Sequence, residues 1–208
     1  MADAFAITDR ICGKHRGQPT TLVGIDGPGG AGKTTFAASL TKELRRRRSP
    51  TQIIHMDDFF LPSQERPRGT VQRRPIGGDF DWERLRDQVL LLLRHGEPAR
   101  FQCYDWKRNC LAEWYNVSKG GVIIVEGIYS TRQELRGFYD LRVWIECPRR
   151  VRLARGIERD GEQARTQWET EWMPSEDRYM TAHQPAAYAD FVVKTLTPQP
   201  SRELLRND

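Results

Sequence analysis

The feature that most constrains this chain is the stretch GIDGPGGAGKTTFAASL, residues 24–40. Its first nine positions hold five glycines and one proline, and the positions that follow have the composition of a helix. Residues 27–34 match the pattern GxxxxGK[ST], and an apolar run precedes them. Because glycine tolerates backbone conformations that other residues rarely adopt, several amide N–H groups can turn toward one point. A strand, a tight loop and a helix in this order predict an α/β domain.

This loop predicts a phosphate-binding site. Amide N–H groups and the positive end of the following helix attract phosphate oxygens, the lysine can reach the β- and γ-phosphates, and the threonine hydroxyl can bind Mg²⁺. The full eight-residue pattern and its flanks favour this interpretation over a glycine-rich turn that merely joins a strand to a helix. We therefore expect a nucleoside triphosphate to contact Gly27, Gly29, Gly30, Ala31, Gly32, Lys33, Thr34 and Thr35.

Short apolar runs alternate with amphipathic segments along the rest of the chain. The runs predict strands at residues 20–25, 52–56, 121–127, 141–147 and 190–194. Periodicity predicts helices at 33–48, 82–95, 149–160 and 162–182, a short helix near 131–137, and an N-terminal helix that packs Phe5, Ile7 and Ile11. Segments 100–106 and 111–117 predict a small hairpin. Strands that alternate with helices predict a central, mostly parallel sheet with helices on both faces and a ligand crevice at its carboxyl edge.

Composition excludes several classes of protein. A chain of 208 residues suits one domain, and no apolar run approaches the ~20 residues of a membrane span. The N-terminus lacks the pattern of a secretory signal. Four scattered cysteines predict neither disulfides nor a zinc site, so we expect reduced thiols and a cytoplasmic protein, with no membrane partner.

The net charge of +5 can attract nucleic acid or a polyphosphate ligand. Four consecutive arginines at 45–48 lie at the end of the first predicted helix, where the helix dipole favours cations. These arginines need no partner, so nucleic acid is an unlikely ligand at this segment. Two carboxylates, Asp57 and Glu126, end strands, and we expect them to meet the glycine-rich loop at one sheet edge.

Six motifs together resemble a known family. GIDGPGGAGKTT, MDDFF, GDFDW, QCYDW, IIVEGI and RLARGIERD occur in the order seen in uridine kinases, phosphoribulokinase and bacterial pantothenate kinase. The resemblance covers residues 20 to about 194, and the segment HQPAAYADFVV resembles the closing strand near the adenine pocket. It implies a three-layer P-loop kinase fold with an arginine-rich lid helix. It also implies an ATP- and Mg²⁺-dependent kinase that phosphorylates a hydroxyl of a nucleoside-like or sugar-like acceptor.

The resemblance also implies a division of the chain. We expect a single domain over 1–208 with its core at 20–197 and a frayed tail at 198–208. Two insertions, at about 58–80 and 97–118, are expected on the acceptor side, and the lid at about 149–163.

Carboxylates near the phosphates resemble the family's base and metal ligands. Asp57 resembles the base that accepts the acceptor's proton; a helix-capping or turn aspartate is the alternative, and Asp58 is the alternative base. Glu126 resembles the acidic residue that holds Mg²⁺, together with Thr34 and, partly through water, Asp57. A structural partner for Glu126 is the other interpretation.

Acceptor contacts are carried over from three motif positions. Asp81 resembles a residue that binds sugar hydroxyls, although it also lies where it can cap the helix at 82–95. Tyr104 resembles a residue that stacks near the acceptor base, with packing in the core as the alternative. Asn109 stands where uridine kinases carry a histidine, and this departure puts uridine itself in doubt.

Three arginines, Arg152, Arg155 and Arg159, lie at spacings of three and four residues and share one helical face. They resemble the lid that closes over ATP, and Arg155 is also expected to act in catalysis and to contact the acceptor. A solvated basic face paired with Glu158 and Asp160 is the alternative.

Two other functions remain open from the sequence. A nucleoside monophosphate kinase needs arginines for the acceptor phosphate, and Arg68, Arg73 and Arg74 could supply them. A non-catalytic nucleotide-binding module that contacts nucleic acid is the second. The sequence leaves a homo-oligomer open as well.

Overall fold

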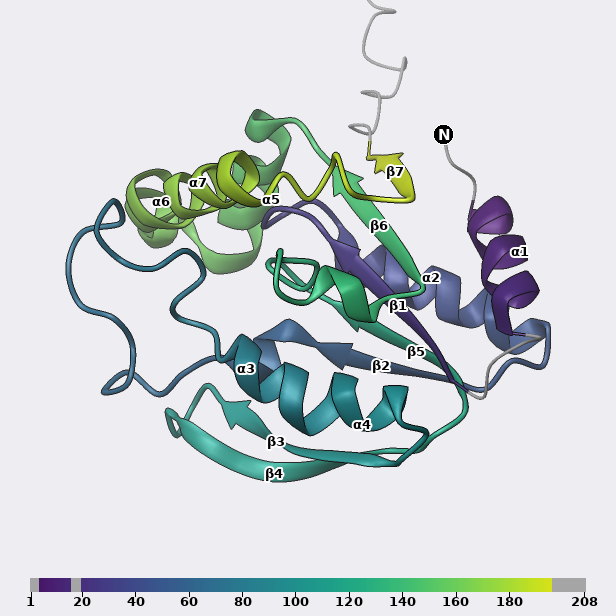
Figure 1. Cartoon of the computed structure of the whole chain (residues 1–208). Helices are drawn as coiled ribbons and strands as arrows, with labels where there is room; N and C mark the ends of the chain where they lie inside the picture. The colour runs from purple at the N-terminus through teal and green to yellow at the C-terminus, as the bar shows by residue number, and fades with distance from the viewer. Residues whose placement is uncertain (1–3, 16–19, 196–208) are drawn as a thin grey trace, which may run out of the picture.

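The computed structural model describes residues 4–15 and 20–195, and Figure 1 shows its elements. Five parallel strands form the central sheet in the order β2-β5-β1-β6-β7. Their bounds are β1 Thr20–Asp26, β2 Thr51–His55, β5 Gly121–Glu126, β6 Leu141–Glu146 and β7 Phe191–Lys194. The parallel sheet predicted from the sequence is therefore confirmed. The predicted tail at 198–208 lies outside the described residues.

Successive residues of the buried strands pack on opposite faces of the sheet. Val23 and Ile25 of β1 contact the side covered by helices α1 (Ala4–His15) and α2 (Lys33–Arg46). Leu22, the residue before Val23, contacts the other side, where the helical segment 82–94 and the hairpin lie. Because both faces of the sheet are buried, the strand sequences are continuously apolar rather than alternating between apolar and polar residues. Helices on both faces give three layers (Figure 1).

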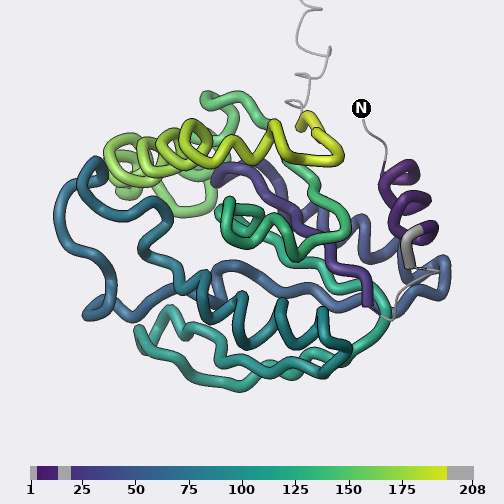
Figure 2. The backbone as a smooth tube through the Cα atoms, viewed as in Figure 1, coloured from purple at the N-terminus to yellow at the C-terminus, as the bar shows by residue number. Residues whose placement is uncertain are grey.

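The layer on the Leu22 face of the sheet consists of one interrupted helix and a hairpin. The helix consists of α3 (Trp82–Leu85), a π-helical turn (Arg86–Leu90) and α4 (Leu91–Arg94). The hairpin consists of β3 (Ala99–Asp105) and β4 (Cys110–Val117), which pair antiparallel. Figure 2 shows the helical segment lying between the hairpin and the sheet.

The remaining helices lie at the end of the molecule above the glycine-rich loop (Figure 1). They are α5 (Arg149–Asp160), α6 (Arg165–Gln167) and α7 (Met173–His183), with a 3-10 turn at Glu162–Ala164 and a π-helical turn at Trp168–Trp172. Among the described residues, no helix is long and apolar enough to cross a membrane.

Two local expectations were wrong. The short helix near 131–137 is only a 3-10 turn at Arg136–Phe138, since Thr131 uses its N–H and hydroxyl to bind Asp26 rather than to start a helix. Phe5 is 53% exposed, whereas Ile7 and Ile11, one helical turn apart, are fully buried. The helix α1 therefore packs through the face that carries the two isoleucines.

We predict opposite effects of alanine at two helical glycines. A Cβ at Gly156 in α5 would lie 2.4 Å from the buried Trp168 ring, so Gly156→Ala should lower the free energy of unfolding by about 1–3 kcal/mol. Gly13 in α1 has open space around it, so Gly13→Ala should raise that free energy by up to about 1 kcal/mol. Denaturant unfolding measures both variants, and stabilisation by Gly156→Ala would contradict the packing described.

Candidate active site

The glycine-rich loop connects β1 to α2 at the carboxyl edge of the sheet. Gly30 and Gly32 have φ of 72° and 96°, which other residues adopt at a cost. Gly32 precedes α2 and provides no side-chain cap. Within the described residues, the amide N–H groups of Gly30, Gly32, Lys33 and Thr34 have no hydrogen-bond acceptor. Unpaired donors at the positive end of a helix fit a phosphate group.

The first half of the loop is bound by protein carboxylates. The N–H of Gly27 donates to Asp26 Oδ1 (2.6 Å), and that of Gly29 donates to Glu176 Oε1 (2.8 Å). A Cβ on Gly29 would lie 2.7 Å from the same Glu176 oxygen, so only glycine fits this contact. Hydrogen bonds to carboxylates thus fix the start of the loop, whereas the N–H donors named above are unpaired at its end.

Asp26 is a fully buried carboxylate with several donors around it. Oδ2 accepts hydrogen bonds from the N–H and the hydroxyl of Thr131 (both 2.9 Å) and from the hydroxyl of Tyr179 (2.6 Å). Burial raises the pKa of Asp26, and the Tyr179 hydrogen bond is the largest of the effects that oppose the rise. The Tyr179 hydrogen bond thus connects α7 to the end of β1.

Glu176 joins α7 to α5 as well as to the loop. Its Oε2 accepts a hydrogen bond from Arg152 Nη1 (2.8 Å), and both side chains are buried, with 7% and 5% of their surface exposed. Burial raises the pKa of Glu176, while the N–H of Gly29, Lys33 and Arg152 oppose the rise. Arg152, expected in the lid over ATP, is therefore paired with a buried carboxylate of the protein itself.

The other two lid arginines lie in different surroundings. Arg155 Nη1 donates to the carbonyl of Gly30 at 3.3 Å, so this side chain lies against the loop. Arg159 pairs with Asp160 at 2.7 Å, which raises the pKa of Arg159, and the charge of Asp57 contributes to that rise. Arg159 is thus close enough to Asp57 to interact electrostatically with it.

A buried carboxylate, Glu126 at the end of β5, contacts two neighbouring elements. Its Oε1 accepts hydrogen bonds from Thr34 Oγ1 of α2 (3.0 Å) and from His55 Nδ1 of β2 (2.6 Å). This hydrogen bond raises the pKa of His55. Among the described residues there is no cluster of three His, Cys, Asp or Glu that could hold a metal by itself. A hydroxyl and a carboxylate beside open phosphate donors instead fit Mg²⁺, which usually keeps several waters and phosphate ligands.

Asp57 lies in the 3-10 turn Met56–Phe59, two residues beyond the end of β2. Its side chain is solvent-accessible but closely surrounded by protein, and this partial burial raises the pKa of Asp57. The positive charge of Lys33 opposes the rise, and the negative charge of Glu126 adds to it. The pKa of Asp58 is also raised by burial, but this carboxylate interacts with Cys103 of the hairpin. The two adjacent aspartates thus point to different surroundings.

Residues expected on the acceptor side make hydrogen bonds within the protein. Asp81 Oδ1 accepts the N–H of Arg84 (2.9 Å), so Asp81 caps α3, and its Oδ2 lies 3.5 Å from the Arg84 guanidinium. Tyr104 is only 6% exposed, and its hydroxyl donates to Asn109 Oδ1 (2.8 Å). Asn109 has a φ of 53° at the hairpin turn, a conformation that asparagine tolerates better than most residues.

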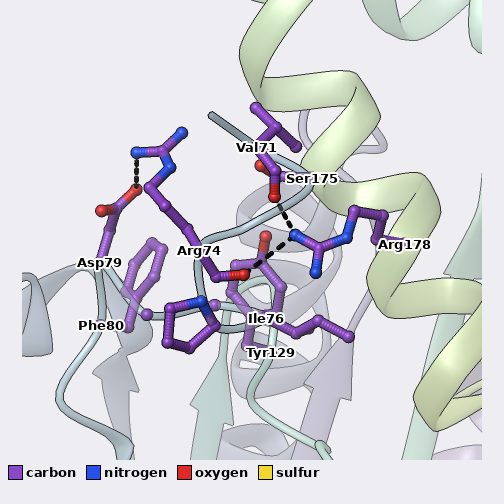
Figure 3. Close-up of a pocket in the computed structure, with 11 residues that line it drawn as sticks. Val71, Arg74, Ile76, Asp79, Phe80, Tyr129, Ser175 and Arg178 are labelled. Atoms are coloured by element: carbon purple, nitrogen blue, oxygen red, sulfur yellow. Dashed lines mark hydrogen bonds and ion pairs between the residues drawn. The ribbon is translucent and has the colours of Figure 1, made fainter. Parts of the chain in front are cut away.

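The loop before α3 is anchored on α7, as Figure 3 shows. Arg178 points from α7 toward this loop and donates to the carbonyls of Val71 and Arg74. Arg74 in turn lies 3.5 Å from Asp79. The cavity that these residues line measures about 20 Å³, room for about one water molecule.

A larger cavity of about 410 Å³ lies beside the glycine-rich loop and the end of β6. Its lining is mostly apolar, and it opens next to the first residues of the loop. The lining residues are Pro28, Trp144, Glu146, Cys147, Arg152, Met180, Gln184, Pro185, Ala186 and Ala187.

Sequence reasoning missed His55, Glu176 and Tyr179. His55 lies two residues before Asp57 at a strand end, and that position was a usable signal. Glu176 and Tyr179 come from a helix about 150 residues away from the loop they contact, and no local pattern marks such a contact.

We predict that Glu176→Ala lowers the free energy of unfolding by about 3–5 kcal/mol, because it leaves Arg152 buried without a partner. Glu169→Ala is the matched control: Glu169 is half-exposed and pairs with Arg165 at 3.5 Å, so it should cost less than about 1 kcal/mol. Chemical unfolding of the two variants tests the difference. Equal, small losses of unfolding free energy in the two variants would show that the Arg152–Glu176 pair does not stabilise the packing of α5 against α7.

Comparisons with known proteins agree with this geometry. The inorganic pyrophosphatase TTM1 of Arabidopsis thaliana is 34% identical over 150 residues, which are 69% of this chain and 21% of that protein, so the match spans about a fifth of that relative. A uridine kinase of Ureaplasma parvum is 28% identical over 76% of this chain and 81% of its own.

A solved structure from Bacillus stearothermophilus, described as a possible uridine kinase, has a TM-score of 0.69 at 24% identity, over 90% of this chain and 99% of that one. The model of the phosphoribulokinase / uridine kinase family matches residues 22–197. The chain therefore belongs to the phosphoribulokinase / uridine kinase family.

Proposed function

We propose that this protein is an ATP- and Mg²⁺-dependent kinase that transfers the γ-phosphoryl group to a hydroxyl of a small nucleoside-like or sugar-like acceptor. The observation that carries the proposal is the meeting of four groups from three elements: Lys33 and Thr34 of α2, Asp57 of the turn after β2, and Glu126 of β5. The pKa of Asp57 responds to Lys33 and Glu126, and Glu126 binds Thr34 directly. Phosphoryl transfer needs this combination of a cation, metal ligands and a base.

Nucleotide binding is supported by the open half of the loop and by the cavity beside it. The amide N–H groups of Gly30, Gly32, Lys33 and Thr34 are available to β-phosphate oxygens. The mostly apolar cavity near Pro28 and Gln184 suits a purine ring, since such cavities bind planar ligands mainly through apolar contacts. Lys33 Nζ contacts the Pro28 carbonyl at 3.0 Å and can exchange this neutral partner for a phosphate oxygen.

Thr34 and Glu126 are the proposed holders of Mg²⁺, with Asp57 contributing partly through water. When bound, Mg²⁺ would supply positive charge that offsets the negative charge of the phosphates. His55 keeps Glu126 Oε1 in place through its 2.6 Å hydrogen bond. Arg155, which lies against the loop, and Arg159, which interacts with Asp57, are positioned to neutralise charge on the transferred group.

Asp57 is the proposed base. It lies at the same sheet edge as the phosphate loop and is accessible to an incoming hydroxyl. A raised pKa brings its basicity closer to that needed for proton abstraction. Asp81, whose Oδ1 caps α3, can give an acceptor hydroxyl only its Oδ2.

We predict that Asp57→Asn lowers kcat by about 10²–10⁴-fold, because asparagine cannot accept the proton, while ATP binding is retained. Asp58→Asn, the adjacent control, should lower kcat by less than about tenfold because Asp58 faces Cys103. ADP release measures turnover, and calorimetry measures ATP binding. Undiminished turnover by Asp57→Asn would remove the base assignment.

A pH profile gives a second test. Only the ionised carboxylate of Asp57 accepts a proton, so kcat/KM should fall as the pH decreases through the raised pKa of Asp57. The acid limb should therefore lie above the ordinary aspartate value of about 3.9. Rates over a pH series, with the fold checked by circular dichroism, locate this limb. A limb at or below the ordinary value would contradict the environment described for Asp57.

A further inference from the structure

A cluster of four aromatic side chains, which pack against one another, begins at Phe60, three residues after Asp57. We use the name aromatic cluster for Phe60, Phe80, Tyr104 and Trp106. The N–H of Phe60 donates to the carbonyl of Asp57 at 3.3 Å, so the cluster starts beside the proposed base. Phe60 stacks on Trp106 with ring centroids 4.6 Å apart, and it meets Phe80 and Tyr104 edge to face at 5.0 and 5.4 Å.

The cluster offers little ring surface to a ligand. The Arg66 guanidinium lies 4.4 Å from the centroid of Phe60, and Trp106 stacks on the same ring. Phe60 is therefore in contact with two planar groups of the protein itself. Tyr104 is only 6% exposed, Phe60 and Phe80 are half-buried, and Trp106 is 59% exposed. A nucleobase cannot enter between rings that already touch.

Arg66 is held in this position by several hydrogen bonds. Its Nε donates to the Leu61 carbonyl (2.7 Å), and its Nη2 donates to the Tyr104 hydroxyl (3.0 Å) and to Asn109 Oδ1 (3.2 Å). Asn109 also exchanges hydrogen bonds with Ser63, by its Nδ2 at 2.6 Å and its Oδ1 at 2.9 Å. Tyr104 and Asn109, two of the residues that sequence reasoning assigned to the acceptor, thus bind the chain's own arginine.

One edge of the guanidinium remains open. Nη1 carries two N–H donors and has no protein acceptor among the described residues. No carboxylate in the described chain forms an ion pair with Arg66, and its side chain is half-buried. A fixed, half-buried guanidinium with free donors is a strong binding group for a carboxylate or phosphate.

We propose that the acceptor is a compact hydroxyl compound without a nucleobase, whose carboxylate or phosphate group is bound by Nη1 of Arg66. The inference rests on the proposed kinase function and narrows its acceptor. Arg66 stacks against Phe60 and occupies the space that a nucleobase would need. Its guanidinium supplies a positive charge for the anionic group of the acceptor. Asp57 faces the hydroxyl of the acceptor.

The test compares four acceptors by ADP release: D-glycerate, glycerol 3-phosphate, neutral glycerol and uridine. The wild-type protein should use at least one anionic compound with a kcat/KM about tenfold or more above those of glycerol and uridine. Which of the two anions is preferred distinguishes a carboxylate from a phosphate. Uridine as the best acceptor would overturn the inference and leave the kinase proposal intact.

Variants of Arg66 separate binding from chemistry. Arg66→Gln should raise KM for the anionic acceptor about tenfold or more, with a smaller change in kcat, and Arg66→Lys should recover part of the loss. Arg48→Gln is the control, because Arg48 follows the end of α2, is exposed, and its side chain makes no hydrogen bond or ion pair with a described residue. An unchanged KM in Arg66→Gln would overturn the inference.

Calorimetry with a non-hydrolysable ATP analogue measures binding of the same two anions without turnover. Binding by the wild type that is lost in Arg66→Gln supports the inference even if no ADP forms, in which case only the kinase proposal fails. If neither anion binds, the Arg66 site is rejected.

Discussion

The site depends on two buried carboxylates that hold the start of the glycine-rich loop. Asp26 accepts the N–H of Gly27 and Glu176 accepts the N–H of Gly29, so the first donors of the loop are used inside the protein. Burying a carboxylate is costly unless donors surround it, and both residues have such donors. This arrangement fixes the loop before any ligand arrives and leaves the N–H donors of Gly30, Gly32, Lys33 and Thr34 for a phosphate. A site organised in advance loses little free energy when the ligand binds.

Parallel strands supply the second constraint. β1, β2 and β5 end at the same edge, so the loop after β1, His55 at the end of β2 and Glu126 at the end of β5 meet there. Acidic groups at this edge repel one another, and the cations Lys33 and Arg159 offset that repulsion around Asp57. Helices α5 and α7 cover the loop from the other side through Arg152 and Tyr179. The chemistry therefore comes from four separate parts of the chain on one rigid sheet.

Much of the fold was predictable because strand and helix periodicities are local. All five strands of the sheet, the hairpin and the long helices were predicted at close to their observed residues. The short helix near 131–137 was not, since Asp26, distant in sequence, takes the donors of Thr131. The side chains that sequence reasoning missed have the same explanation. Glu176, Tyr179 and Arg66 are important because of contacts that form only when the chain folds. Arg152 illustrates the limit most clearly, because helical spacing placed it beside Arg155 but could not reveal its buried partner.

Nucleotide affinity measured by calorimetry tests the central claim most directly. If the open amides of the loop bind the β-phosphate, ATP and ADP with Mg²⁺ should bind at least about 100-fold more tightly than AMP, since AMP lacks the group that those donors contact. Adenine contacts alone would give the three nucleotides similar affinities. AMP binding as tightly as ATP would contradict the account.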